Sequence, residues 1–131
     1  MFTIRTNKKM QLVDITDNVR ESVGRKKFTG ICHIYLPHAT AGLMINEFEP
    51  RIEQDFQTVF ERVLPNVHFE HDEIDDNASA HLLSGLVGCE VSVPVKDGAL
   101  TLGTWQRIIL CEFDGPRERT VFINLIPGER V

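Results

Sequence analysis

Apolar residues recur with the period of strands over most of the chain, and with the period of a helix in three places. Seven segments have the strand pattern: residues 2–4, 12–15, 31–36, 43–45, 90–95, 105–113 and 120–126. The run from Ile31 to Leu36 is apolar at nearly every position, which predicts a strand at the centre of a sheet. Asp97-Gly98, between two such patterns, is typical of a hairpin turn.

The most regular helical pattern follows Pro50, a residue suited to the first turn of a helix. It predicts a helix that packs on the core and ends at Pro65, with an apolar stripe of Ile52, Phe56, Val59, Phe60 and Val63. A shorter helix is expected to begin at Thr16, its predicted N-cap, and to end near Arg25.

The stretch from residue 66 to residue 75 is polar and acidic, which predicts an exposed loop. After it, Asp75 or Asp76 is expected to cap a short helix that carries His81 and ends at one of the next two glycines. These elements predict a single α+β domain over residues 1–131. Its sheet should be mainly antiparallel, a sandwich or a partly closed barrel, with two or three helices.

The charge balance limits the possible partners. With 14 Lys and Arg against 19 Asp and Glu, the formal charge is −5 at pH 7. Nucleic acids and membranes attract basic surfaces, so neither is expected as a partner, although Arg20 and residues 25–27 could form a local basic patch. No apolar run has the length of a membrane span, and residues 1–5 lack the centre of a signal peptide. Three separated cysteines in apolar runs predict reduced, buried thiols and a cytoplasmic location: Cys32, Cys89 and Cys111.

Three histidines stand among polar or small residues: His38, His71 and His81. Imidazole binds metals and transfers protons near neutral pH, so these are the candidate catalytic and metal-binding groups. A divalent ion, zinc or magnesium, is expected and no organic cofactor; carboxylates that could assist are Glu47, Asp55, Asp75 and Asp76. The spacing matches no short zinc motif, so the alternative is that the histidines bond loop carbonyls or are solvated. His33 and His68 are expected to have no role in a site.

Three other groups could bind a ligand. Thr40–Gly42 could offer backbone N–H groups to an anion, or could simply form a tight turn. Arg117 and Arg119 flank a turn and could hold a phosphate, although arginines at turns are usually solvated. Trp105, the only tryptophan, and Gln106 could stack on and orient a planar ring, whereas base rates favour a buried tryptophan.

Five short motifs follow one another along the chain: His38-Ala-Thr-Ala-Gly-Leu, Asn46-Glu47, Asp76-Asn-Ala-Ser-Ala-His81, Leu102-Gly-Thr-Trp-Gln106 and Asp114-Gly-Pro-Arg117. In residues and in order they resemble the YjbQ-like family, which is often labelled secondary thiamine-phosphate synthase. The resemblance runs from about Gly30 to Gly128, with a compatible N-terminal region. Ala39 and Asp76 depart from it, since threonine and glycine are common at those places.

The resemblance implies a compact α+β fold, a homotrimer, and a polar pocket near the subunit interface. It implies that the three histidines form a metal-associated or anion-binding site. The substrate-binding residues expected around them are Thr40, Gly42, Asn77, Trp105, Gln106 and Arg117.

The expected function is that of a small cytoplasmic enzyme that acts on a phosphorylated or otherwise anionic small molecule. By resemblance the reaction is thiamine-phosphate synthesis, in which a thiazole phosphate joins a pyrimidine pyrophosphate. The chain has no clear Lys/Arg cluster for two phosphorylated substrates, which suits a weak activity as well as a dedicated one. The alternatives are a metal-dependent hydrolase, a non-catalytic metabolite-binding trimer, and a purely structural role for the histidines and Trp105.

Overall fold

The apolar run after Thr29 forms the central strand of the larger sheet, as predicted. The computed structural model describes residues 1–24 and 27–131. Its first sheet is antiparallel and has five strands, in spatial order β1 (Phe2–Arg5), β8 (Glu118–Pro127), β3 (Gly30–Tyr35), β5 (Glu90–Lys96) and β6 (Ala99–Leu100). The predicted hairpin turn joins β5 to β6, and Asp97 and Gly98 both have positive φ.

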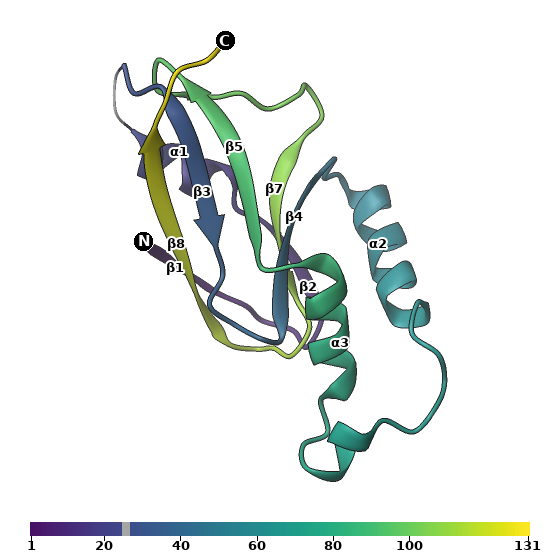
Figure 1. The fold of residues 1–131 in the computed structure, drawn as a ribbon. Coiled ribbons are helices and arrows are strands. Elements are labelled where there is room, and N and C mark those ends of the chain that lie inside the picture. The colour runs from purple at the N-terminus through teal and green to yellow at the C-terminus, as the bar shows by residue number, and fades with distance from the viewer. Residues whose placement is uncertain (25–26) are drawn as a thin grey trace.

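A second antiparallel sheet faces the first (Figure 1). Its strands are, in order, β2 (Gln11–Asp14), β7 (Arg107–Glu112) and β4 (Ala41–Asn46). The main core lies between the two sheets, and α1 (Thr16–Val23) closes it with Val19 and Val23. The predicted α+β fold of antiparallel strands is confirmed.

The outer face of the second sheet carries a smaller core. There α3 (Ala78–Val87) packs Ala80 and Leu83 against Ile109 and Cys111 of β7. The three cysteines are free, as expected. Burial raises the pKa of the Cys32 thiol to about 11 and that of the Cys111 thiol to about 12, whereas Cys89 is only half-buried.

The predicted N-terminal capping residues of two helices, α1 and α3, and the predicted end of α1 were wrong. The Asp14 carboxylate, and not Thr16, accepts the first hydrogen bonds of α1, from the Thr16 N–H and hydroxyl. α1 ends at Val23, because Gly24 turns into the left-handed region; the predicted patch residues Arg25 and Lys26 lie outside the described residues. Similarly, neither predicted aspartate caps α3, since the N–H of Ala78 donates to Asp72 at 2.9 Å.

The long helix after Glu49 is confirmed as α2 (Pro50–Arg62). Its predicted packing on the core is confirmed for Phe56 and Phe60, which are half-buried against the smaller core, but is wrong for Val59 and Val63. No residue of α2 is buried, and the side chains of Val59 and Val63 are 53% and 51% exposed. Phe60 alone makes a close ring contact with the core, edge-on to Phe113 at 5.1 Å. α2 stands out from the two sheets (Figure 1), and the apolar face that its periodicity identified is only partly covered.

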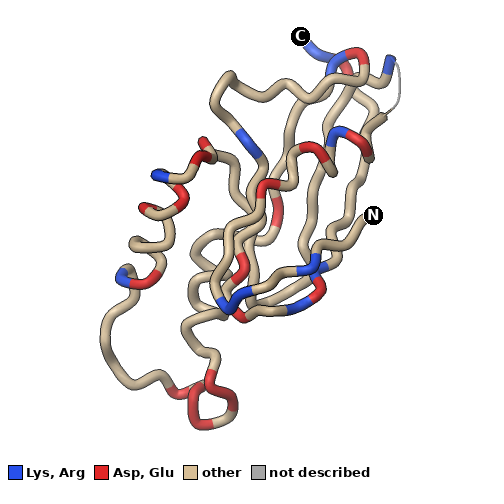
Figure 2. The backbone as a smooth tube through the Cα atoms, turned by 180° about the vertical axis from the view of Figure 1, so that it is seen from behind, with Lys and Arg blue, Asp and Glu red and all other residues tan. Residues whose placement is uncertain are grey.

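The polar segment between α2 and α3 contains a short 3-10 helix, η1 (Glu70–Glu73), in addition to the predicted loop. Five acids gather between residues 70 and 76, which we call the acidic lobe, and Figure 2 shows it at the tip of the molecule. Of the helices in the described residues, none combines the length and the apolar character that crossing a membrane requires.

Candidate functional site

Two of the predicted histidines meet. His71 lies in η1 and His81 on the first turns of α3, and their ring centroids are 4.7 Å apart in an edge-to-face arrangement. Both are half-buried, so each ring is held by its surroundings while remaining open to a ligand.

A chain of hydrogen bonds fixes one of these rings. The Nδ2 of Asn77 faces an Oδ atom of Asp114 at 3.3 Å, and its Oδ1 lies 3.0 Å from Nε2 of His71. A carboxylate only accepts, so the Asn77 amide must donate to Asp114 and turn its oxygen to His71. Nε2 of His71 therefore carries the proton, which leaves Nδ1 as the ring atom with a lone pair when the ring is neutral.

Arg117 is the last residue in this series of hydrogen bonds. Its guanidinium donates to the backbone oxygen of Asp114 at 2.7 Å and to the carboxylate at 3.0 Å, yet the side chain stays 54% exposed. We call the connected set the histidine cluster: His71, His81, Asn77, Asp114 and Arg117.

A buried ion pair lies beside the cluster, and sequence analysis missed it. The guanidinium of Arg119 donates to both oxygens of Glu112, and both side chains are almost completely buried. Arg119 also donates to the hydroxyl and the carbonyl oxygen of Thr40, and Thr6 donates to Glu112 at 2.7 Å. The solvated role expected for Arg119 is therefore wrong. The available signal was Glu112, a charge inside an apolar strand, followed by an arginine on the next strand.

His38 is tied to the same region by a different bond. Its Nε2 accepts a hydrogen bond of 2.9 Å from the N–H of Thr120, so the neutral ring carries its proton on Nδ1. Removal from solvent and the nearby charge of Arg119 hold the pKa of His38 below its ordinary value. Binding a metal through Nε2 would require this hydrogen bond to break, whereas donating from Nδ1–H to an anion would not.

The small residues after His38 serve packing. Thr40 is buried with its hydroxyl bonded to Arg119, and Gly42 lies inside β4. A Cβ on Gly42 would stand 2.8 Å from a methyl carbon of Val87 and 2.9 Å from the carbonyl oxygen of Gly88. Glycine is thus needed for the close approach of α3 to the sheet, and the strand leaves no separate anion-binding turn.

Trp105 and Gln106 lie away from the histidine cluster. They precede β7 and line a shallow cavity of about 360 Å³ with Ile45, Asn46 and Glu47, at the far end of β4. The side chain of Trp105 is 72% exposed, so the expectation of a buried tryptophan is wrong. One chain therefore does not place these two residues in the wall of the histidine site.

The metal-ligand set predicted from the three histidines is not assembled within one chain. Over the described residues, the His, Cys, Asp and Glu groups whose ligand atoms lie within 4.8 Å of one another are His68, Glu70 and Glu73, all exposed. His71 and His81 can supply two nitrogen ligands, and a third would have to come from water or another chain. Asp55 is exposed on α2, and Glu47 lines the cavity at Trp105.

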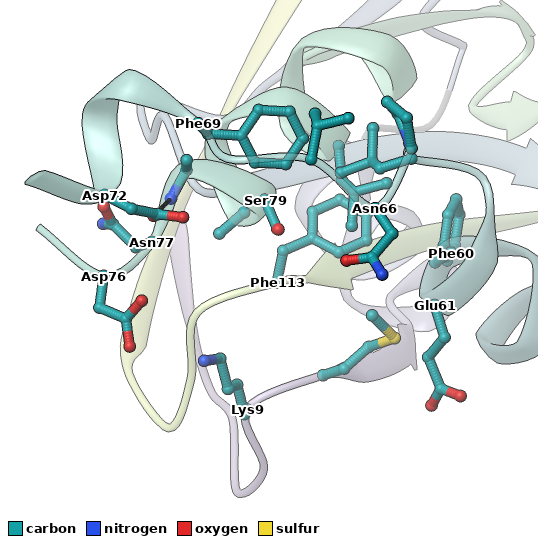
Figure 3. Close-up of a pocket in the computed structure, with 17 residues that line it drawn as sticks. Lys9, Phe60, Glu61, Asn66, Phe69, Asp72, Asp76, Asn77, Ser79 and Phe113 are labelled. Atoms are coloured by element: carbon teal, nitrogen blue, oxygen red, sulfur yellow. Dashed lines mark hydrogen bonds between the residues drawn. The ribbon is translucent and has the colours of Figure 1, made fainter.

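A larger groove of about 590 Å³ is lined by one side of α3, and neither His71 nor His81 is among its lining residues (Figure 3). Its floor is apolar, with Phe60 and Phe113, and Asn77 connects its rim to His71. Its charged lining comprises Lys9 against three acids, Glu61, Asp72 and Asp76. This balance disfavours an anion in the groove.

Comparison with known proteins identifies relatives along the whole fold. The chain is 42% identical over 126 residues to a UPF0047 protein of Archaeoglobus fulgidus, covering 95% of this chain and 98% of the relative. It is 41% identical to the UPF0047 protein YugU of Bacillus subtilis, covering 94% and 95%.

Solved structures of similar proteins have the same fold. A hypothetical protein of Aeropyrum pernix superimposes with a TM-score of 0.89 at 39% identity, covering 97% of this chain and 96% of the other. A protein of unknown function from Sulfolobus solfataricus gives 0.86 at 41% identity, covering 93% and 91%. The family model described as UPF0047 protein YjbQ-like matches residues 1–128. The chain therefore belongs to the YjbQ-like UPF0047 family.

Proposed function

We propose that the protein binds a phosphorylated or otherwise anionic small molecule at the histidine cluster. The observation that carries this proposal is the contact of His71 with His81, with one ring oriented through Asn77 and Asp114. Ring orientation by a hydrogen-bonded partner is what a histidine needs to hold or move a proton at a defined atom.

The donors on this side of α3 suit an anion. The half-exposed guanidinium of Arg117 offers charged N–H groups, and the neutral ring of His38 offers its Nδ1–H. His38 is close enough to Arg117 and Arg119 for both charges to act on its ring, so the three groups share one region. Only Arg117 among them combines charge with exposure, which fits one phosphate better than two.

The reaction implied by the family resemblance is group transfer that joins a thiazole phosphate to a pyrimidine pyrophosphate with release of pyrophosphate. In this scheme His71 and His81 would move protons, while a divalent ion such as zinc or magnesium would assist the leaving group. The three predicted histidine ligands do not come together within one chain. This favours direct binding of the anion by the histidines over a tightly held metal ion.

Isothermal calorimetry with inorganic phosphate tests the binding proposal. We expect binding by the wild type and at least a tenfold loss in His81→Ala and in Arg117→Gln. His68→Ala is the matched control, because that histidine is exposed, faces Glu73 and lies outside the histidine cluster. Equal affinity in all four proteins, or binding in none, would contradict the proposal; metal analysis of the same samples reports whether an ion accompanies it.

A further inference from the structure

The groove beside α3 has the size of a small-molecule site, and the proposed anion site does not use it. Its volume of about 590 Å³ falls within the roughly 300–1,000 Å³ of such sites. Residues of α2 line one wall and residues of α3 the other, and the segment between the two helices completes the lining (Figure 3). Of the histidine cluster, Asn77 alone lines the groove, so the two sites are neighbours but separate.

The floor of the groove can hold an apolar body. The ring of Phe113 is buried and lies edge-on to Phe60 at 5.1 Å, so the two rings fix each other. Phe69 adds a third ring to the lining. Aromatic rings bury a large apolar area and attract cations at their faces. Three of them in one groove therefore suit a ligand that is both apolar and positively charged.

The charges of the lining favour the same kind of ligand. Three carboxylates, from Glu61, Asp72 and Asp76, stand against one ammonium group, from Lys9, and all four residues are exposed. In Figure 3 the two aspartates lie at one end of the groove and Glu61 at the other, with Phe113 between them. The aspartates belong to the acidic lobe, whose other acids add negative charge at that end. A surface of one sign beside apolar walls concentrates ligands of the opposite sign.

An organic cation fits this arrangement better than a metal ion does. Over the described residues, neither Glu61 nor Asp76 belongs to a set of three metal-ligand groups whose atoms lie within 4.8 Å of one another. Asp72 already accepts a hydrogen bond of 2.9 Å from the N–H of Ala78. A divalent ion needs several oxygens that converge on one point. Separated carboxylates around an apolar floor instead balance a charge that is carried on an organic body.

We propose that the groove between α2 and α3 binds a small organic cation, an ammonium group carried on an aromatic or aliphatic body. The body packs on Phe60 and Phe113, and the ammonium group lies towards Asp72 and Asp76. This site goes beyond the anion site at the histidine cluster, and either proposal can fail while the other holds.

Calorimetry with three probes of similar shape tests the sign of the ligand. The probes are benzyltrimethylammonium, neutral benzyl alcohol and anionic phenylacetate. We expect the wild type to bind the cation, and to bind the other two about tenfold more weakly or not at all. Equal affinity for the three probes, or no binding of the cation, would overturn the proposal.

Two neighbouring acids of the acidic lobe provide matched variants. Asp76 lines the groove and Asp75 does not, and both are exposed, so Asp76→Asn and Asp75→Asn remove the same charge with the fold expected to persist. We expect the cation to bind about fivefold more weakly to Asp76→Asn and with nearly unchanged affinity to Asp75→Asn. An equal loss in both variants would indicate a general attraction to the acidic surface and would overturn the groove site.

The backbone amide signals in NMR spectra locate the bound cation. We expect saturable shifts at Asn66 and Ser79, which line the groove. Shifts confined to Glu70, Glu73 and Asp75, which do not line it, would overturn the proposal. Phosphate binding is measured separately, so a failure of the anion site would leave this result unchanged.

Discussion

At the residue scale, the buried ion pair of Glu112 and Arg119 stabilises the fold beside the site. Both charges are out of contact with water, so each depends on the other for compensation. Removing one partner of such a pair leaves the other charge uncompensated, at a cost of about 3–5 kcal/mol. We expect Glu112→Gln to lower the free energy of unfolding by that amount in urea denaturation. Glu118→Gln, at an exposed position on the following strand, is the control. A loss no larger than the control's would show that the pair contributes little.

His38 predicts a pH dependence whose sign follows from its environment. Its pKa in the folded chain lies below the ordinary 6.5, because burial and the charge of Arg119 disfavour the charged ring. The unfolded chain therefore takes up a proton first as the pH falls, and stability is lost from about pH 6.5 down to the folded-state pKa. We expect His38→Gln, whose amide oxygen can accept from Thr120, to show a smaller loss of melting temperature across this window. An identical pH profile in the two proteins would contradict this.

Residue identity predicted the candidate site only in part. His71 and His81 were found because polar groups among small residues are uncommon without a role. Asn77 was expected from the family resemblance and Arg117 from its place at a turn, and the structure brings all four together. Which residues share a site depends on strand pairing, which the chemistry of a residue does not report. For that reason the sequence did not predict that Trp105 lies apart from the histidine cluster within one chain.

At the element scale, α3 depends on one glycine of the strand beneath it. In Gly42→Ala the new methyl group would meet Val87 and Gly88 below 3 Å, and such overpacking costs about 1–3 kcal/mol. Gly85 is the matched control, since a Cβ there meets nothing within 4 Å. Gly85→Ala should stabilise the helix by up to about 1 kcal/mol.

Thermal and urea unfolding of the two alanine variants should therefore give effects of opposite sign. Similar effects from Gly42→Ala and Gly85→Ala would mean that α3 moves away from the sheet at little cost.

Periodicity predicted the elements well and their surroundings poorly. The strands, the central place of β3 and the long helix α2 follow from local pattern, because alternation and helical spacing are properties of a short segment. The burial of Val59 and the cap of α3 by Asp72 depend on what lies nearby in space. Helical spacing identifies an apolar face without saying what covers it.

At the scale of the whole molecule, charge is unevenly spread. The acidic lobe stands at one tip (Figure 2). Arg117, in the histidine cluster, is half-exposed, and Arg119, beside it, is buried. An anionic ligand is therefore expected to approach the histidine cluster from the side of β8 rather than through the acidic-rimmed groove. This arrangement makes the histidines themselves the best reporters of binding.

A specific anion site at the histidine cluster can be tested by titrating phosphate while following the ring protons of all five histidines by NMR. We expect saturable shifts at His71 and His81, a smaller one at His38, and none at His33 and His68. Assignment uses single histidine-to-glutamine variants. Shifts confined to His68, or equal and unsaturable at every histidine, would contradict a specific anion site at the histidine cluster.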